Sequence, residues 1–107
     1  HCFTETWEVA QAALELGFYI SFSGIVTFKN ATQIKQVAQN MPLSQMLVET
    51  DSPYLAPVPF RGKLNHPALV KHVAEHIADL RGQSFAEIAA ATTDNFFRLF
   101  QAARAAA

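Results

Sequence analysis

The sequence predicts an α/β fold in which helices cover a parallel sheet. Two short segments rich in β-branched and aromatic residues, near 18–22 and 46–50, predict strands. Segments with apolar residues at helical spacing precede, separate and follow them. Strands that alternate with helices are typical of parallel sheets. At 107 residues, 50% of them hydrophobic, the chain can form one packed domain and is not intrinsically disordered.

The first half of the chain begins with a predicted helix near 5–16. Thr4 or Thr6 can cap its start, and Gly17 follows its end. Its apolar positions are Val9, Ala12, Ala13 and Leu16. After the strand near 18–22, Asn30 precedes a second predicted helix near 31–40, with Gln33 three residues later in a capping-box pattern. Pro42 closes that helix.

The second half begins with the strand near 46–50 and a proline-containing loop, residues 52–66. Pro67 suits the first turn of a helix near 67–81, which Gly82 ends. Ser84 and Glu87 form a capping box for a short helix near 85–91. A last helix is expected near 93–103. Two strands cannot form a sheet buried on both faces, and His1 stands in the middle of an apparent motif, so we expect residues 1–107 to be part of a larger domain.

Composition excludes several classes of protein. A net charge of -1 and a pI near 6.4 argue against a broad cationic surface, so nucleic-acid contact would need a local site or a metal. The single cysteine, Cys2, allows no internal disulfide and suits a reducing compartment. No uncharged run reaches the roughly 20 residues of a membrane span, and no signal peptide is evident. We expect a cytoplasmic protein that does not bind membranes.

Three clusters contain side chains suited to chemistry. His1 stands just before a helix start. Glu49 and Asp51 follow a buried strand, at the strand end where parallel α/β folds place active sites. The Asp51 carboxylate can bind a divalent cation and accept a proton from water. Arg61 and Lys63, separated by a glycine, can hold a phosphate or another anion.

A fourth pattern points to another class of enzyme. The segment His72-Val73-Ala74-Glu75-His76 matches the H-x-x-E-H string of inverted zinc peptidases. The apolar stripe of this helix leaves both histidines on one flank and turns Glu75 away from the core, as in an ordinary amphipathic helix. A zinc site also needs a third protein ligand, and the 31 residues after His76 offer few acids. The peptidase interpretation is therefore disfavoured.

Taken together, the sequence resembles the TatD-type deoxyribonuclease family of metal-dependent hydrolases. The string E-T-D-S-P-Y-L-A-P at 49–57 and the R-G-K-x-N-x-P loop at 61–67 carry most of the resemblance. Further matches follow the same order along the chain: His1-Cys2-Phe3-Thr4, residues 17–24 and 27–31, and Thr93 with Asn95. Glu5 departs from the pattern, because the family usually has glycine there, and Leu64 and His66 stand where charged residues are common.

The resemblance implies the C-terminal part of a (β/α)₈ TIM-type barrel, about its last two to three β/α units. It implies that His1 and Asp51 bind divalent metal ions (Mg, Mn or Zn, two in the full-length protein) and that Asp51 is also catalytic. The family's other ligands, a His-x-His pair, a glutamate and another histidine, are not among these residues. The implied activity is hydrolysis of phosphodiester bonds in DNA. The composition of the loop, and not the resemblance, predicts that Arg61 and Lys63 contact substrate phosphate.

Two alternatives remain open. A related metal-dependent hydrolase acting on another ester or amide would use the same ligands, and assays on single-stranded DNA and on small esters distinguish the two. A non-catalytic α/β module is the other, and a His-x-His motif upstream would argue against it. The 107-residue chain alone is expected to be inactive, since catalytic metal sites generally need three protein ligands.

Overall fold

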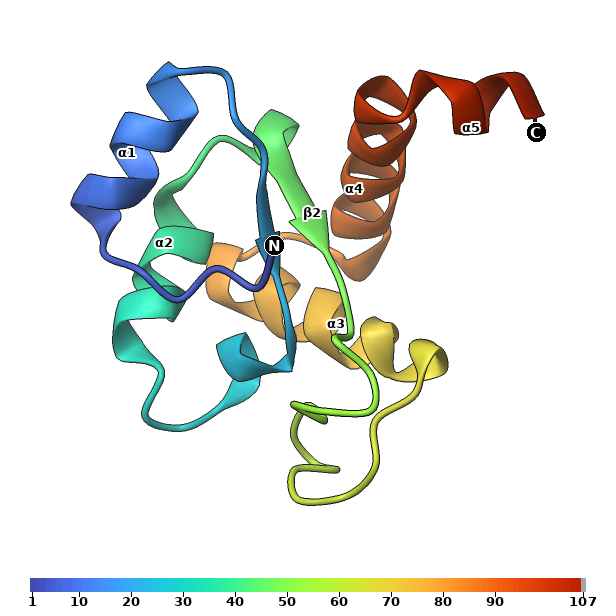
Figure 1. The fold of residues 1–107 in the computed structure, drawn as a ribbon. Helices are drawn as coiled ribbons and strands as arrows, with labels where there is room; N and C mark the ends of the chain where they lie inside the picture. Colours follow the sequence, from blue (N-terminus) through green and yellow to red (C-terminus); the bar gives the residue numbers. More distant parts are fainter. Residues whose placement is uncertain (107) are drawn as a thin grey trace.

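A computed structural model of the chain describes residues 1–106, with side chains through Ala103. Its elements are α1 (Trp7–Glu15), β1 (Ile20–Phe22), α2 (Thr32–Asn40), β2 (Met46–Val48), α3 (Val70–Arg81), α4 (Phe85–Leu99) and α5 (Gln101–Ala106). Three 3₁₀ turns connect them: η1 (Gly24–Thr27), η2 (Leu43–Gln45) and η3 (Pro67–Leu69). Helix α3 packs against α2, α4 and η1, with the strands in front of it in Figure 1.

The two strands are parallel neighbours, as the sequence predicts. Ile20 lies opposite Met46. Beyond β2, the Glu49 N–H donates to the Phe22 carbonyl oxygen at 2.9 Å, so the pairing continues past the strand end. On the other edge of β1, the Phe3 N–H donates to the Ser21 carbonyl oxygen at 2.9 Å. Three segments therefore lie side by side, and the carboxyl ends of both strands point toward the N-terminus of the chain.

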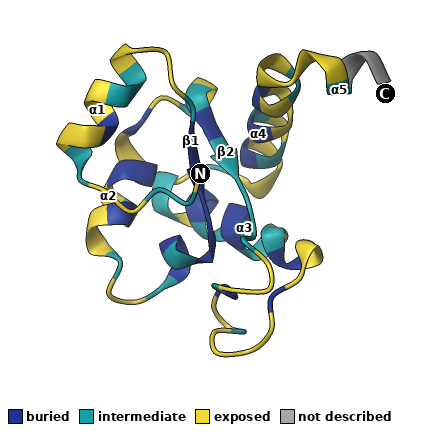
Figure 2. Cartoon of the chain, viewed as in Figure 1, coloured by how far each residue is buried: buried dark blue, intermediate teal, exposed yellow. Residues whose placement is uncertain are grey.

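One face of this small sheet is the core of the molecule. Ile20, Phe22 and Met46 are buried there. The helices cover them with Val37 and Ala38 from α2, Val73 and Ile77 from α3, and Ile88 from α4. Figure 2 shows these buried residues concentrated on the strands and the inner sides of α2 and α3. Burial of this apolar cluster is the main source of stability, at roughly 25 cal/mol for each Å² removed from water.

Most predicted helix ends are confirmed. The side chains of Thr6 and Ser84 each accept a hydrogen bond from the backbone N–H three residues later, at 3.2 and 3.1 Å. Gly17, which follows the C-cap residue Leu16 of α1, and Gly82, the C-cap of α3, adopt positive φ angles of 85° and 65°. A left-handed residue at this position costs glycine little, because it has no Cβ. Pro67 opens η3, which leads into α3.

Other boundaries differ from the prediction. The helices expected near 85–91 and 93–103 are one helix, α4, that runs to Leu99 and is followed by the short α5. No helix-breaking residue interrupts it, and the Thr92 hydroxyl donates back to the Ile88 carbonyl at 2.8 Å. The strands cover only 20–22 and 46–48, where the two backbones pair. The Phe18 N–H instead donates to the Ala13 carbonyl of α1 at 3.0 Å, so the chain is still leaving the helix at that point.

Two predictions for the first half of the chain are also wrong. Asn30 does not cap α2: the N-cap is Ala31, with no side-chain hydrogen bond. In α1, Val9 and Leu16 are 46% and 74% exposed, and Ala10 is the buried residue. Tertiary packing presents a different face of this helix from the one its apolar spacing predicts. None of the helices within residues 1–106 has the length and hydrophobicity needed to cross a membrane.

Candidate metal centre

The carboxyl ends of the strands bring together one imidazole and two carboxylates. His1 Nδ1 lies 2.8 Å from Glu49 Oε1, and His1 Nε2 lies 3.8 Å from Asp51 Oδ1. One ligand atom from each residue lies within 4.8 Å of the other two. This is the one such group of three that the described part of the chain contains. The shared metal site that the resemblance implies requires His1 and Asp51 to lie close together, and they do. Whether they bind a metal remains a prediction.

The backbone after β2 explains how both acids reach the same place. Successive residues of an extended chain point to opposite faces, so Glu49 and Asp51 share one. Asp51 then adopts a φ of +56°, and its carbonyl oxygen accepts a hydrogen bond from the Tyr54 N–H at 3.0 Å. Cys2, beside His1, has a φ of +45°. Non-glycine residues at positive φ are uncommon and concentrate at functional sites.

Glu49 is the most enclosed member of the cluster. Its side chain is 19% exposed, compared with 33% for Asp51 and 77% for His1. Its Oε2 accepts a hydrogen bond from the Cys2 N–H at 2.9 Å. Its Oε1 is buried and, in the described residues, has no aligned hydrogen-bond donor. His1 Nδ1 makes an ion-pair contact with Oε1 that lacks hydrogen-bond alignment. Because a carboxylate oxygen has two lone pairs, Oε1 can still accept a further contact.

Glu49 belongs to the acidic cluster that the sequence shows after the strand near 46–50, but the sequence pattern alone gives it no role. The available signal was its spacing of two residues from Asp51, which puts both on one face of an extended chain. A carboxylate against one ring nitrogen commonly fixes a metal-binding histidine and leaves the other nitrogen free for the ion. The arrangement of Glu49, His1 and Asp51 has this form.

The basic residues of the loop lie apart from this cluster. The Arg61 guanidinium carbon is 4.0 Å from the centroid of the Phe28 ring, and Lys63 is exposed. Neither forms an ion pair with any side chain that the structure describes. Asn65 is buried, and its Nδ2 donates to the Thr50 carbonyl at 2.6 Å. Asn65 therefore fastens the loop to the end of β2.

The H-x-x-E-H pattern of α3 forms no metal site within the described residues. His76 Nε2 lies 2.7 Å from Lys35 Nζ, which also donates to the Val26 carbonyl at 2.7 Å. Burial lowers the pKa of Lys35. Burial, and then the charge of Lys35, lowers the pKa of His76, while Asp79 opposes the shift. A neutral His76 accepting from a charged Lys35 fits this geometry, so these residues hold α2 and α3 together.

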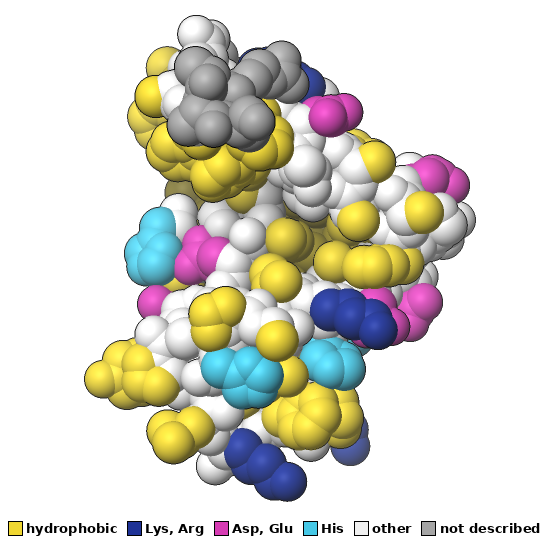
Figure 3. Space-filling view, turned by 90° about the vertical axis from the view of Figure 1, so that its right-hand side faces the viewer, with side chains coloured by type: hydrophobic (Ala, Val, Ile, Leu, Met, Phe, Trp, Pro, Cys, Tyr) yellow, Lys and Arg dark blue, Asp and Glu magenta, His cyan; other side chains and the backbone are white. Residues whose placement is uncertain are grey.

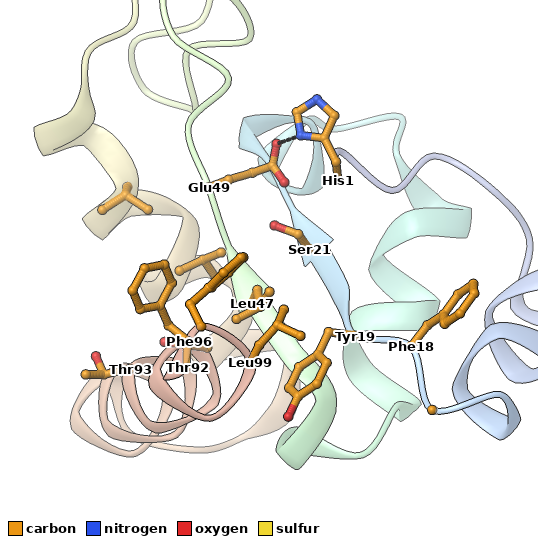
Figure 4. Close-up of a pocket in the computed structure, with 14 residues that line it drawn as sticks. His1, Phe18, Tyr19, Ser21, Leu47, Glu49, Thr92, Thr93, Phe96 and Leu99 are labelled. Atoms are coloured by element: carbon orange, nitrogen blue, oxygen red, sulfur yellow. Dashed lines mark ion pairs between the residues drawn. The ribbon is translucent and has the colours of Figure 1, made fainter. Parts of the chain in front are cut away.

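A groove of about 750 Å³ extends from the cluster along the strands and α4. In Figure 4 the His1–Glu49 pair lies at one end, and Phe96 and Leu99 of α4 line the other. Phe96, Leu99 and Phe100 are each 43–48% exposed. Figure 3 shows hydrophobic side chains gathered beneath the C-terminal helix and, at the margin of the same face, histidine next to acidic side chains. The groove thus has a polar end and an apolar end.

Comparison with known protein sequences finds one family and relatives named as metal-dependent hydrolases. Residues 1–101 match the sequence model of the family described as TatD related DNase. The chain is 63% identical over 100 residues to the uncharacterized metal-dependent hydrolase YcfH of Escherichia coli strain K12, covering 94% of this chain and 38% of YcfH. It is 52% identical over 101 residues to the uncharacterized metal-dependent hydrolase YabD of Bacillus subtilis strain 168, covering 94% of this chain and 40% of YabD.

Solved structures of TatD-family proteins superpose on this chain. The crystal structure of YjjV, a TatD homologue from Escherichia coli K12, superposes with a TM-score of 0.84 and 30% identity, over 91% of this chain and 38% of YjjV. A TatD-family hydrolase structure from Entamoeba histolytica gives a TM-score of 0.78 at 16% identity, over 91% of this chain and 40% of that one, which shows likeness of fold. The chain thus spans about two fifths of the length of these relatives.

Proposed function

The chain belongs to the TatD-related DNase family, and on that premise we propose that the full-length protein is a divalent-metal-dependent hydrolase that cleaves phosphodiester bonds of DNA. The observation that carries the proposal is the convergence of His1, Glu49 and Asp51 at the carboxyl ends of the strands. The names of its relatives support metal dependence, since YcfH and YabD are each called a metal-dependent hydrolase.

The donor set suits a divalent cation such as Mg²⁺, Mn²⁺ or Zn²⁺. The 3.8 Å between His1 Nε2 and Asp51 Oδ1 is shorter than two metal–ligand bonds of about 2.0–2.2 Å end to end, so one ion can contact both. The buried, unsatisfied Glu49 Oε1 adds negative charge beside them. A group of two carboxylates and an imidazole, in which a buried oxygen accepts no aligned hydrogen bond from the described residues, is better explained by a cation than by a structural role.

Each residue has a distinct part in the reaction. A divalent cation held here would polarise the phosphoryl group and make water a better nucleophile near neutral pH. Asp51 holds the ion, orients the attacking water and accepts its proton. Glu49 contacts Nδ1 of His1 and fixes the ring, which leaves Nε2 free to hold the ion. Further ligands come from the rest of the full-length protein, as the family resemblance implies.

We also propose that the full-length protein forms a (β/α)₈ barrel, of which this chain supplies the last strands. In the described residues the outer edge of β2 is unpaired. The exposed apolar end of the groove lies beside α4, where a further β/α unit would cover it. Unpaired strand edges are normally covered or closed into barrels. Two paired parallel strands with their acids at the carboxyl end agree with this arrangement.

The test is turnover of single-stranded DNA by the full-length protein with Mg²⁺ or Mn²⁺. We expect Asp51→Asn to lower the rate by at least about a hundredfold. Asp94→Asn is the control, because Asp94 is an exposed acid on α4 without an ion pair in the described residues. Metal-dependent cleavage of small esters without cleavage of DNA would favour the broader hydrolase alternative. An inactive protein with intact ligands would contradict the proposal.

A further inference from the structure

The loop between β2 and η3 forms a second concave surface, separate from the candidate metal centre. A cavity of about 350 Å³ is lined by Phe28 and by two stretches of this loop, residues 53–56 and 61–63. Its first stretch begins two residues after Asp51. The surface is therefore continuous in sequence with the strand end that carries the acids.

The charges around this cavity are positive and, within the described part of the chain, form no ion pairs. Arg61 lies over the Phe28 ring, an arrangement that holds the guanidinium in place while its N–H groups stay at the edge. Lys63 lines the same cavity and is exposed. Residues 52–66 contain no Asp or Glu, and the lower end of Figure 3, which this loop forms, shows basic but no acidic side chains. Two such cations beside a cavity favour an anion.

The same cavity has an exposed aromatic ring. Tyr54 is 70% exposed and lines the same cavity as Arg61. An exposed ring beside cations is the combination that single-stranded nucleic acids use, because an unpaired base stacks on the ring while its phosphate contacts the cations. A base in a duplex is already stacked and paired, so the arrangement selects an unpaired strand.

Hydrogen bonds fasten this cavity to the metal centre. The Tyr54 N–H donates to the Asp51 carbonyl at 3.0 Å. Asn65 Nδ2 donates to the carbonyls of Thr50 and Tyr54 at 2.6 and 2.8 Å, and the Asn65 N–H donates to the Pro53 carbonyl at 3.0 Å. Both arms of the loop are thus joined at the end of β2. A ligand in the cavity is held at a fixed position relative to Asp51.

We propose that this cavity binds a nucleotide that flanks the cleaved bond of single-stranded DNA. Arg61 and Lys63 contact its phosphate, and Tyr54 stacks on its base. The inference rests on the proposed function, since it names the substrate form and the residues that position it. These residues bind the strand and take no part in breaking the bond.

Binding is measured without cleavage, by fluorescence anisotropy of a labelled oligothymidylate with the full-length protein in EDTA. We expect the double variant Arg61→Ala/Lys63→Ala to bind about tenfold more weakly. The slope of log affinity against log salt falls by about 1.4, for two lost phosphate contacts on a single strand. Tyr54→Ala also weakens binding about tenfold but keeps the salt slope, and Tyr54→Phe binds like wild type.

Lys71→Ala is the matched control, because Lys71 is exposed on α3 and lines neither the groove nor this cavity. A double variant with the affinity and salt slope of Lys71→Ala would overturn the proposal, as would a wild-type protein that does not bind the oligonucleotide. Measuring DNA turnover with Mn²⁺ distinguishes a failure of this subsite proposal from a failure of the proposed nuclease function. Cleavage with an unchanged KM in the double variant means that the subsite is wrong and the nuclease stands. If the double variant and Tyr54→Ala bind more weakly but wild type does not cleave DNA, the subsite is supported and the nuclease proposal is wrong.

Discussion

An enclosed polar side chain lies at each end of β2, and the two side chains differ in their hydrogen bonding. At the amino end, Asn95 of α4 is 1% exposed, and its Nδ2 donates to the carbonyls of Leu43 and Met46, each at 2.8 Å. At the carboxyl end, Glu49 has a buried Oε1 without an aligned donor in the described residues. The buried Asn95 Nδ2 thus has hydrogen-bond partners, whereas the buried Glu49 Oε1 has none that is aligned.

The difference separates a stabilising residue from a functional one. Buried polar groups in native proteins are nearly always hydrogen-bonded, so an exception calls for an explanation. Asn95 needs none, because it joins α4 to η2 and β2. Glu49 lies beside His1 and Asp51, where a cation would complete its contacts. Substitutions at the two ends should therefore affect different measurements.

The largest loss of stability is expected where the carboxyl end meets its loop. A Cβ on Gly24, just after β1, would overlap the Leu55 carbonyl oxygen. Backbone must then move, so Gly24→Ala should cost about 3 kcal/mol of unfolding free energy and displace the loop after Asp51. Thermal unfolding of the full-length protein measures it. Gly62→Ala is the control: its Cβ meets open space, so only the strain of its φ of +89° remains, about 1–2 kcal/mol. Equal losses would contradict the overlap.

At the amino end, Asn95→Ala should lower the unfolding free energy by about 2 kcal/mol, because two carbonyls lose their donor. Metal-dependent turnover below the melting transition should stay at the wild-type level. Thr93→Ala, exposed on the same helix, should change stability by less than about 0.5 kcal/mol. A rate loss in Asn95→Ala, with stability unchanged, would reverse the assignment of the two ends.

At the carboxyl end, Glu49→Gln should have the opposite profile. The amide keeps the shape of the side chain and an oxygen for the Cys2 N–H, so we expect the melting temperature of wild type. It removes the charge that holds His1, so turnover should fall about 10–100-fold. Turnover and thermal unfolding are measured on the same sample. A variant that is destabilised but fully active would show that Glu49 is structural.

A smaller effect is expected away from both ends, between α2 and α3. The pKa of His76 is lowered in the folded protein, so near and below about pH 6.5 the unfolded chain binds more protons than the folded chain. The free energy of unfolding therefore decreases as the pH is lowered. The loss between pH 7.5 and 5.5 should be well under about 1 kcal/mol, because the ring is partly exposed. His76→Gln keeps an acceptor for Lys35 and should flatten this dependence. An unchanged pH profile would exclude His76 as its source.

The sequence predicts the helices, the parallel strands and the place of the acids, because each depends on local patterns. Capping by Ser84 and the glycine after α3 are examples. It does not predict the single helix α4 or the exposed Val9 and Leu16, since these depend on packing between distant elements. At the site, the position of Asp51 follows from the strand, whereas the role of Glu49 requires the position of His1, which only the fold supplies.

Calorimetric titration of the full-length protein with Mn²⁺ measures whether His1, Glu49 and Asp51 form a metal centre, independently of turnover. We predict that Asp51→Asn weakens binding at least about tenfold while its melting temperature without metal stays close to wild type. Asp94→Asn, the exposed acid on α4, should bind Mn²⁺ with wild-type affinity. Equal Mn²⁺ affinity in wild type and Asp51→Asn would show that Asp51 is not a metal ligand.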